Sequence, residues 1–166
     1  MLGKEMLVTQ FGYNAWANGR ILNKAAMVDD EQLNMASVVG DRSLLQILAH
    51  LARVEKVWRL LAETGDVQPD QLPGDDLLGS VEGIQRVLAD EQRKMEAYLA
   101  GLEEDELAAE VTITRWDGIK MVMTRWHMLA HLLMHSMQHR SEAAVLVSNY
   151  GHSPGDIDFL FYVRAD

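Results

Sequence analysis

The chain has 166 residues, 48% of them hydrophobic and 24% charged, which suits one domain with a sizeable core and is too short for two ordinary domains. Its net charge of −10 argues against nucleic acid as a general partner, because phosphate neutralisation by Lys and Arg dominates that kind of binding. The absence of cysteine excludes disulfides, thiolate zinc sites, iron–sulfur clusters and a cysteine nucleophile, so any metal must be held by imidazole and carboxylate groups.

The sequence shows no membrane or export segment. No apolar run approaches the ~20 residues that a spanning helix needs. The first residues, Met1 to Met6, lack the basic and apolar regions of a signal peptide. We therefore expect a cytoplasmic protein without a membrane partner, folded as a single domain over residues 1–166.

A first helix is predicted over residues 2–27, where apolar side chains recur at helical spacing. Asn14 and Asn18 are four residues apart and share the face of Phe11. These two amides are either groups on the helix surface or hydrogen-bonding partners for something buried. The polar segment 28–40 is predicted to be a connector with one helical turn.

A second helix is predicted from a cap at Asp41 or Ser43 to about Glu63. Its buried seam is aliphatic except for His50: Ile47, His50, Val54, Val57 and Leu61. Residues 64–79 contain both Pro69 and Pro73 and several glycines, which is typical of a loop.

A third helix is predicted over residues 80–100, with Val81, Ile84, Leu88, Met95 and Leu99 on its apolar face. Glu91 lies on the same stripe, and we interpret it as a solvated carboxylate at the edge of that stripe.

The two runs Val111–Trp116 and Ile119–Met123 are rich in β-branched residues and flank Asp117-Gly118, which predicts a small β-hairpin. The last long helix should run from Thr124 to Asn149 and end near Gly151, with the aromatic tail 157–163 packed back on the bundle.

The last helix contains four of the six histidines, His127, His131, His135 and His139, each four residues after the one before. Side chains at i and i+4 lie on one helical face, so two imidazoles at this spacing can hold one divalent ion. His135 and His139 are the favoured pair, because they continue an apolar seam of Met128, Leu132, Ala143 and Leu146. His50, in a core position of another helix, is the expected third ligand. The alternative is that these histidines are core residues that hydrogen-bond to their neighbours and bind no metal.

Four long helices and this histidine pattern resemble the DinB family, within the DinB/YfiT-like superfamily. The motifs that carry the resemblance span nearly the whole chain, and they are Tyr13-Asn14-x-Trp16-x-Asn18, Leu48-Ala-His50-Leu with Glu55, His131-x3-His135-x3-His139-Arg140, and Gly151-His-x-Pro154-x-Asp156-x-Asp158-Phe-x-Phe161-Tyr162. The chain departs from the family pattern at Gln138, Ser141 and Glu142.

The resemblance implies an all-α four-helix bundle with a small β-hairpin inserted before the last long helix. It also implies a divalent metal, often zinc or nickel, held by His50, His135 and His139, and assembly as a homodimer. His131, Asn14 and Asn18 are candidates for hydrogen-bonding support of the ligands.

Three histidines with an open coordination position suit catalysis, because an ion held there can lower the pKa of a bound water to ~7, polarise a carbonyl or bind a thiolate. Two enzymes are consistent with this: a metal-dependent hydrolase, and a transferase that uses a low-molecular-weight thiol supplied by the substrate. Weak candidates for catalytic groups are Arg140, Glu55 and Glu142. Arg140 is expected in a surface or interface salt bridge, and orientation of an anionic substrate group is its alternative role. The non-enzymatic alternative is a dimeric stress-response bundle in which the ion has a structural role.

Overall fold

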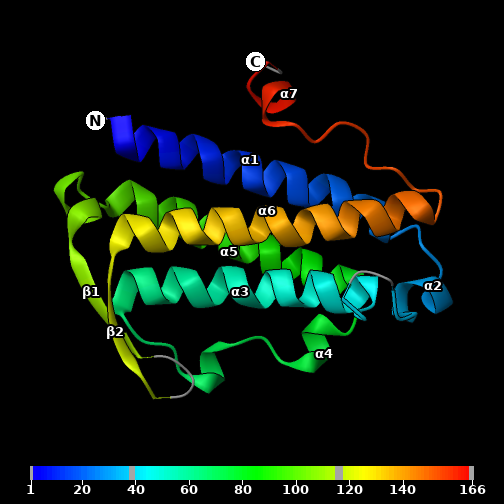
Figure 1. Cartoon of the computed structure of the whole chain (residues 1–166), viewed down its shortest axis with the longest axis horizontal. Coiled ribbons are helices and arrows are strands. Elements are labelled where there is room, and N and C mark those ends of the chain that lie inside the picture. Colours follow the sequence, from blue (N-terminus) through cyan, green and yellow to red (C-terminus); the bar gives the residue numbers. More distant parts are fainter. Residues whose placement is uncertain (1, 38–39, 115–117, 165–166) are drawn as a thin grey trace.

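The computed structural model describes residues 2–37, 40–114 and 118–164. Within them, four long helices lie side by side: α1 (Leu2–Ala25), α3 (Leu44–Thr64), α5 (Val81–Gly101) and α6 (Arg125–Asn149) (Figure 1). Helix α3 packs on α6 and α5, and α1 packs on α5 and α6, which closes the bundle. The predicted all-α bundle is thereby confirmed, with helix ends within about two residues of those expected.

Short elements connect and flank the bundle. They are helix α2 (Asp30–Asn34), a 3-10 turn (Pro69–Gln71), helix α4 (Asp75–Leu78), a second 3-10 turn (Asp105–Ala108), strands β1 (Glu110–Thr114) and β2 (Lys120–Thr124), and helix α7 (Phe159–Val163). The strands form the predicted antiparallel hairpin, with Glu110 opposite Thr124 and Thr114 opposite Lys120. The end of the first run and Asp117 of the proposed turn lie outside the described residues, and Gly118 has a φ of 79°.

The helix ends follow from local chemistry. Ser43, rather than Asp41, caps α3: its hydroxyl accepts from the Gln46 N–H while the Gln46 side chain accepts from the Ser43 N–H. Helix α3 ends at Gly65, which has a φ of 79° and donates its N–H to the carbonyl of Leu61. A side chain at Gly65 would also meet the Thr112 carbonyl oxygen, so this glycine lets the helix end pack against β1.

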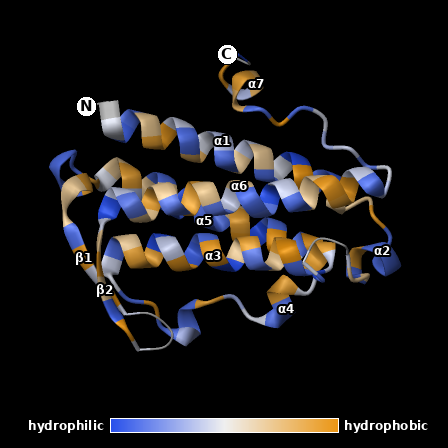
Figure 2. Cartoon of the chain, viewed as in Figure 1, coloured by the Kyte–Doolittle hydropathy of each residue, from blue (hydrophilic) through white to orange (hydrophobic). Residues whose placement is uncertain are grey.

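Figure 2 shows hydrophobic and hydrophilic positions interspersed along the four long helices. The buried apolar side chains form two clusters, one towards each end of the bundle. One cluster contains Ile21, Ile47, Ile84 and Val147, and the other contains Phe11, Leu61, Met95 and Leu129. On each of the four long helices, the segment between the two clusters carries buried polar residues. These residues are Asn14, Asn18, Arg59, Glu91, Ser136, His139 and Arg140. We call these residues, together with Glu55, the central polar layer.

The prediction that Glu91 is a solvated carboxylate is wrong. Glu91 is only 3% exposed, and its Oε2 accepts from the Nε of Arg59 on α3 at 2.7 Å. Arg59 also donates to Glu63 at 2.6 Å. The carboxylate can be buried because a cation from the neighbouring helix lies opposite it, which compensates the lost hydration.

The tail packs back on the bundle as expected. The Tyr13 hydroxyl donates to the Ile157 carbonyl at 2.8 Å, and the Tyr13 ring meets Phe159 edge-on with the ring centroids 5.3 Å apart. The tail therefore covers the outer side of α1. None of the described helices is long and apolar enough to cross a membrane.

Candidate metal centre

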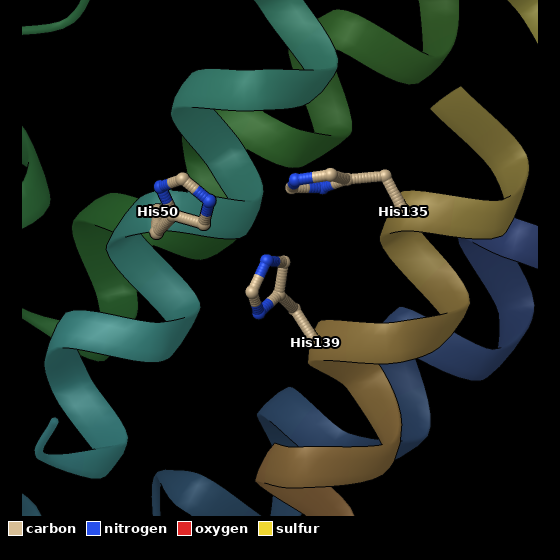
Figure 3. A group of neighbouring side chains, drawn as sticks. All are labelled: His50, His135 and His139. Carbon is tan, nitrogen blue, oxygen red and sulfur yellow. The ribbon is translucent and has the colours of Figure 1, made fainter. Parts of the chain in front are cut away.

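Three histidines converge between α3 and α6 (Figure 3). His50 projects from α3, and His135 and His139 project from successive turns of α6. One nitrogen from each ring lies within 4.8 Å of the others. Among the described residues, this is the group of three or more side chains that is arranged to hold a metal ion. The structure thus brings together the three residues that the sequence singled out.

Two observations show that these rings fit a metal ion. The buried Nδ1 of His135 has no hydrogen-bond partner in the described part of the chain, and a buried nitrogen of this kind is costly unless it is bound. His139 Nδ1 lies 2.7 Å from Glu142 Oε2, which leaves Nε2 as the nitrogen available to an ion. A carboxylate that orients a ligating imidazole in this way is common in metal sites.

The lowered pKa values of two of these histidines favour the neutral imidazole, which is the form that binds a metal ion. Burial lowers the pKa of His50 to about 4, helped by the neighbouring charges of His139, Arg42 and His135. Burial also lowers the pKa of His135, again with a contribution from His139. Both rings are consequently neutral at pH 7, which is the form that binds metal.

His131 and His127 do not join the three. Both are exposed: His131 lies against Trp58, with ring centroids 4.4 Å apart, and His127 lies against Trp126 at 3.9 Å. His131 neighbours His135, at a centroid distance of 5.6 Å, so it borders the site without belonging to the group of three.

Glu55 and its partners lie in the central polar layer and not among the three histidines. The carboxylate Oε1 of Glu55 accepts from the amides of Asn14 and Asn18, each at 2.8 Å, and from Ser136 Oγ at 3.1 Å. The two asparagines are therefore buried hydrogen-bonding partners, which was one of their two expected roles.

The expected surface or interface salt bridge of Arg140 is wrong. Arg140 is 2% exposed, donates to the side-chain carbonyls of Asn14 and Asn18, and lies over the Tyr13 ring at 5.1 Å. Its guanidinium can be buried because these two amides supply acceptors and the tyrosine supplies a π face.

A cleft next to His50 was not predicted from the sequence. The cleft has a volume of about 540 Å³ and is lined by His50, Arg42, Arg53, Gln46 and Asp75, with apolar walls from Leu45, Ala49 and Leu78. Arg42 is exposed, and Arg53 donates to Asp75 at 3.2 Å. The proximity of both arginines to His50 in sequence was a usable signal, but the opposite wall comes from α4 and Gly79, within a segment that the sequence predicted only as a loop.

The fold and the site define a helical bundle with a three-histidine cluster suited to metal. The sequence model of the DinB family matches residues 1–166, and the chain belongs to that family. A DinB-like protein from Bacillus subtilis has a similar fold, with a TM-score of 0.66, 18% identity, and coverage of 89% of this chain and 93% of the other. A protein assigned to the DinB family from Exiguobacterium sibiricum also has a TM-score of 0.66, at 16% identity, with coverage of 92% and 94%. No curated protein matches the chain.

Proposed function

We propose that the chain is a metal-dependent enzyme that binds one divalent ion through His50, His135 and His139. The observation that carries this proposal is the donor set: the described residues offer three imidazoles and no fourth protein ligand, beside a cleft of about 540 Å³. A structural ion would need a closed set of four ligands, whereas an open position is the mark of a catalytic site. Imidazole ligands suit zinc and nickel, which are our candidates for the native metal.

The ion, when bound, would supply Lewis-acid chemistry: it would lower the pKa of a small nucleophile or polarise a carbonyl. Two reaction classes follow from the choice of nucleophile. With water the reaction is hydrolysis, and with a low-molecular-weight thiol it is transfer of a group from the substrate to that thiol. Since the chain has no cysteine, a thiol would have to come from the cosubstrate.

The residues of the chain would position the reactants. Glu142 holds His139 by its Nδ1 and so keeps this ligand in one orientation. Arg42 and Arg53 line the cleft beside His50 and would bind an anionic group of the substrate. Arg42 is the better candidate, because Arg53 is already paired with Asp75.

A paired screen tests this proposal. The zinc-loaded and nickel-loaded chains are assayed with carboxylate-bearing esters and amides, and separately with small thiols and carboxylate-bearing electrophiles. We expect turnover that His50→Ala abolishes and that Arg42→Ala weakens mainly through KM. Turnover that is equal in the wild-type protein and in His50→Ala would assign the activity to a contaminant or to another site.

We also propose that the protein assembles as a homodimer. The supporting observation is exposed apolar side chains on two elements: Trp126, Met134, Met137 and Val145 on α6, and Phe159, Leu160, Phe161 and Val163 on α7. Large apolar side chains that stay exposed in this number are typical of surfaces that form protein–protein contacts. Light scattering on a size-exclusion column should give the mass of two chains, and Met134→Glu should lower it; one chain in the wild-type protein would contradict the proposal.

A further inference from the structure

A second hollow lies between α1 and α5 and has a volume of about 420 Å³, within the range of small-ligand sites. We call it the α1/α5 cleft; it is lined by Ala15, Asn18, Gly19, Leu22 and Asn23 of α1, Gln85, Leu88, Ala89 and Gln92 of α5, and Glu55 of α3. Small residues leave this space open between the helices. A Cβ atom added at Gly19 would meet no atom within 4 Å.

Glu55 lines this cleft, and only one of its two carboxylate oxygens accepts hydrogen bonds. All three of its hydrogen bonds, from Asn14, Asn18 and Ser136, end on Oε1. Oε2 has no hydrogen-bond partner within the described part of the chain. Glu55 lines the α1/α5 cleft and also a smaller hollow beside Arg59 and Glu91, so its Oε2 is an unused acceptor on a residue of the cleft wall.

The charge of Glu55 is only partly compensated. Burial raises the pKa of the Glu55 carboxyl, although its three hydrogen bonds and the charge of Arg140 oppose that shift. The hydrogen bonds of Arg140 go to the oxygens of Asn14 and Asn18 and not to Glu55. A cation at Oε2 would stabilise the ionised carboxylate that burial disfavours.

The remaining lining suits a hydrogen-bond donor with a short apolar body. Among the described residues that line the cleft, Glu55 alone carries a formal charge. The other polar residues are amides, and Gln92 donates its N–H to Glu96 at 2.7 Å, which leaves its carbonyl oxygen as an acceptor. Leu22 and Leu88 provide apolar surface.

We propose that the α1/α5 cleft binds a small organic cation, an ammonium or guanidinium compound, whose N–H groups donate to Glu55 Oε2 and to side-chain carbonyls of the lining. This site is separate from the histidine cluster, and it does not depend on metal binding or on catalysis.

The test is an NMR titration of the ¹⁵N-labelled full-length chain near pH 8 with n-butylammonium chloride, and with 1-butanol as the neutral probe of the same length. We expect saturable shifts of the side-chain amides of Asn18, Asn23, Gln85 and Gln92 with the cation and not with the alcohol. Glu55→Gln keeps an acceptor at Oε1 but removes the charge, and it should weaken binding at least about tenfold.

Gly19→Leu should abolish binding, because it fills the cleft. Its matched control is Gly101→Leu, at a second helical glycine with no atom within 4 Å of an added Cβ, and this variant should bind as the wild type does. Shifts that do not saturate, equal shifts with 1-butanol, or unchanged affinity in Gly19→Leu would each overturn the proposal. If Glu55→Gln does not fold, the comparison of Gly19→Leu with Gly101→Leu decides the question.

Discussion

Replacement of His50 by leucine should make the metal-free protein more resistant to acid. His50 titrates with a pKa of about 4 in the folded chain, against an ordinary value of 6.5. Between these values the unfolded chain binds more protons than the folded chain, so stability is fully present above pH 6.5 and is lost as the pH falls towards 4. At pH 4.5 the loss from this one group approaches about 2.5 kcal/mol, at about 1.36 kcal/mol per pKa unit. Because His50 is partly exposed, solvent screening reduces this to about 1–2.5 kcal/mol.

The assay is urea unfolding followed by circular dichroism, at pH 7.5 and pH 4.5, with a chelator present throughout. The free energy of unfolding of the wild-type chain should fall between these pH values by about 1–2.5 kcal/mol more than that of His50→Leu. His127→Leu removes an exposed histidine outside the cluster and is the matched control, which should follow the wild type. If all three proteins lose stability in parallel, His50 does not occupy the half-buried position in which burial lowers its pKa.

Two further substitutions test the surroundings of the site and the central polar layer. Glu142→Ala removes the hydrogen-bonding partner of His139 Nδ1 and should weaken zinc binding by roughly 10–100-fold. The affinity is measured in a competition titration with a chromogenic chelator. Unchanged affinity would mean that Glu142 does not orient the ligand. Glu91→Ala leaves Arg59 without its buried carboxylate partner, with only the exposed Glu63 still paired to it, and should cost about 3 kcal/mol, which lowers the midpoint of thermal unfolding by roughly 6–12 °C. Glu96→Ala, at an exposed carboxylate on the same helix, should stay within about 0.5 kcal/mol of the wild type, and an equal effect of both changes would contradict the buried pair.

The sequence predicted those features that depend on local spacing. The start of α3 at a cap near Ser43, its end near Glu63 and the i, i+4 spacing of His135 and His139 are all set within a few residues, so periodicity and capping rules place them well. His50 could be selected because one polar residue interrupts an aliphatic seam.

The features that depend on another helix could not be predicted in this way. Glu91 is buried because Arg59, 32 residues earlier, lies opposite it. Arg140 is buried because Asn14 and Asn18, 126 and 122 residues earlier, offer it acceptors. Neither pairing leaves a periodic signal, since both depend on how the helices are aligned along the bundle.

The central claim is that His50, His135 and His139 hold one divalent ion. The most direct measurement is elemental analysis of the protein, purified without a polyhistidine tag, alongside His50→Ala and His135→Ala. We expect about one zinc or nickel ion per chain in the wild type, and its loss in both variants while most helicity is retained. A full equivalent of metal in either variant, or none in the wild type even after reconstitution, would contradict the three-histidine site.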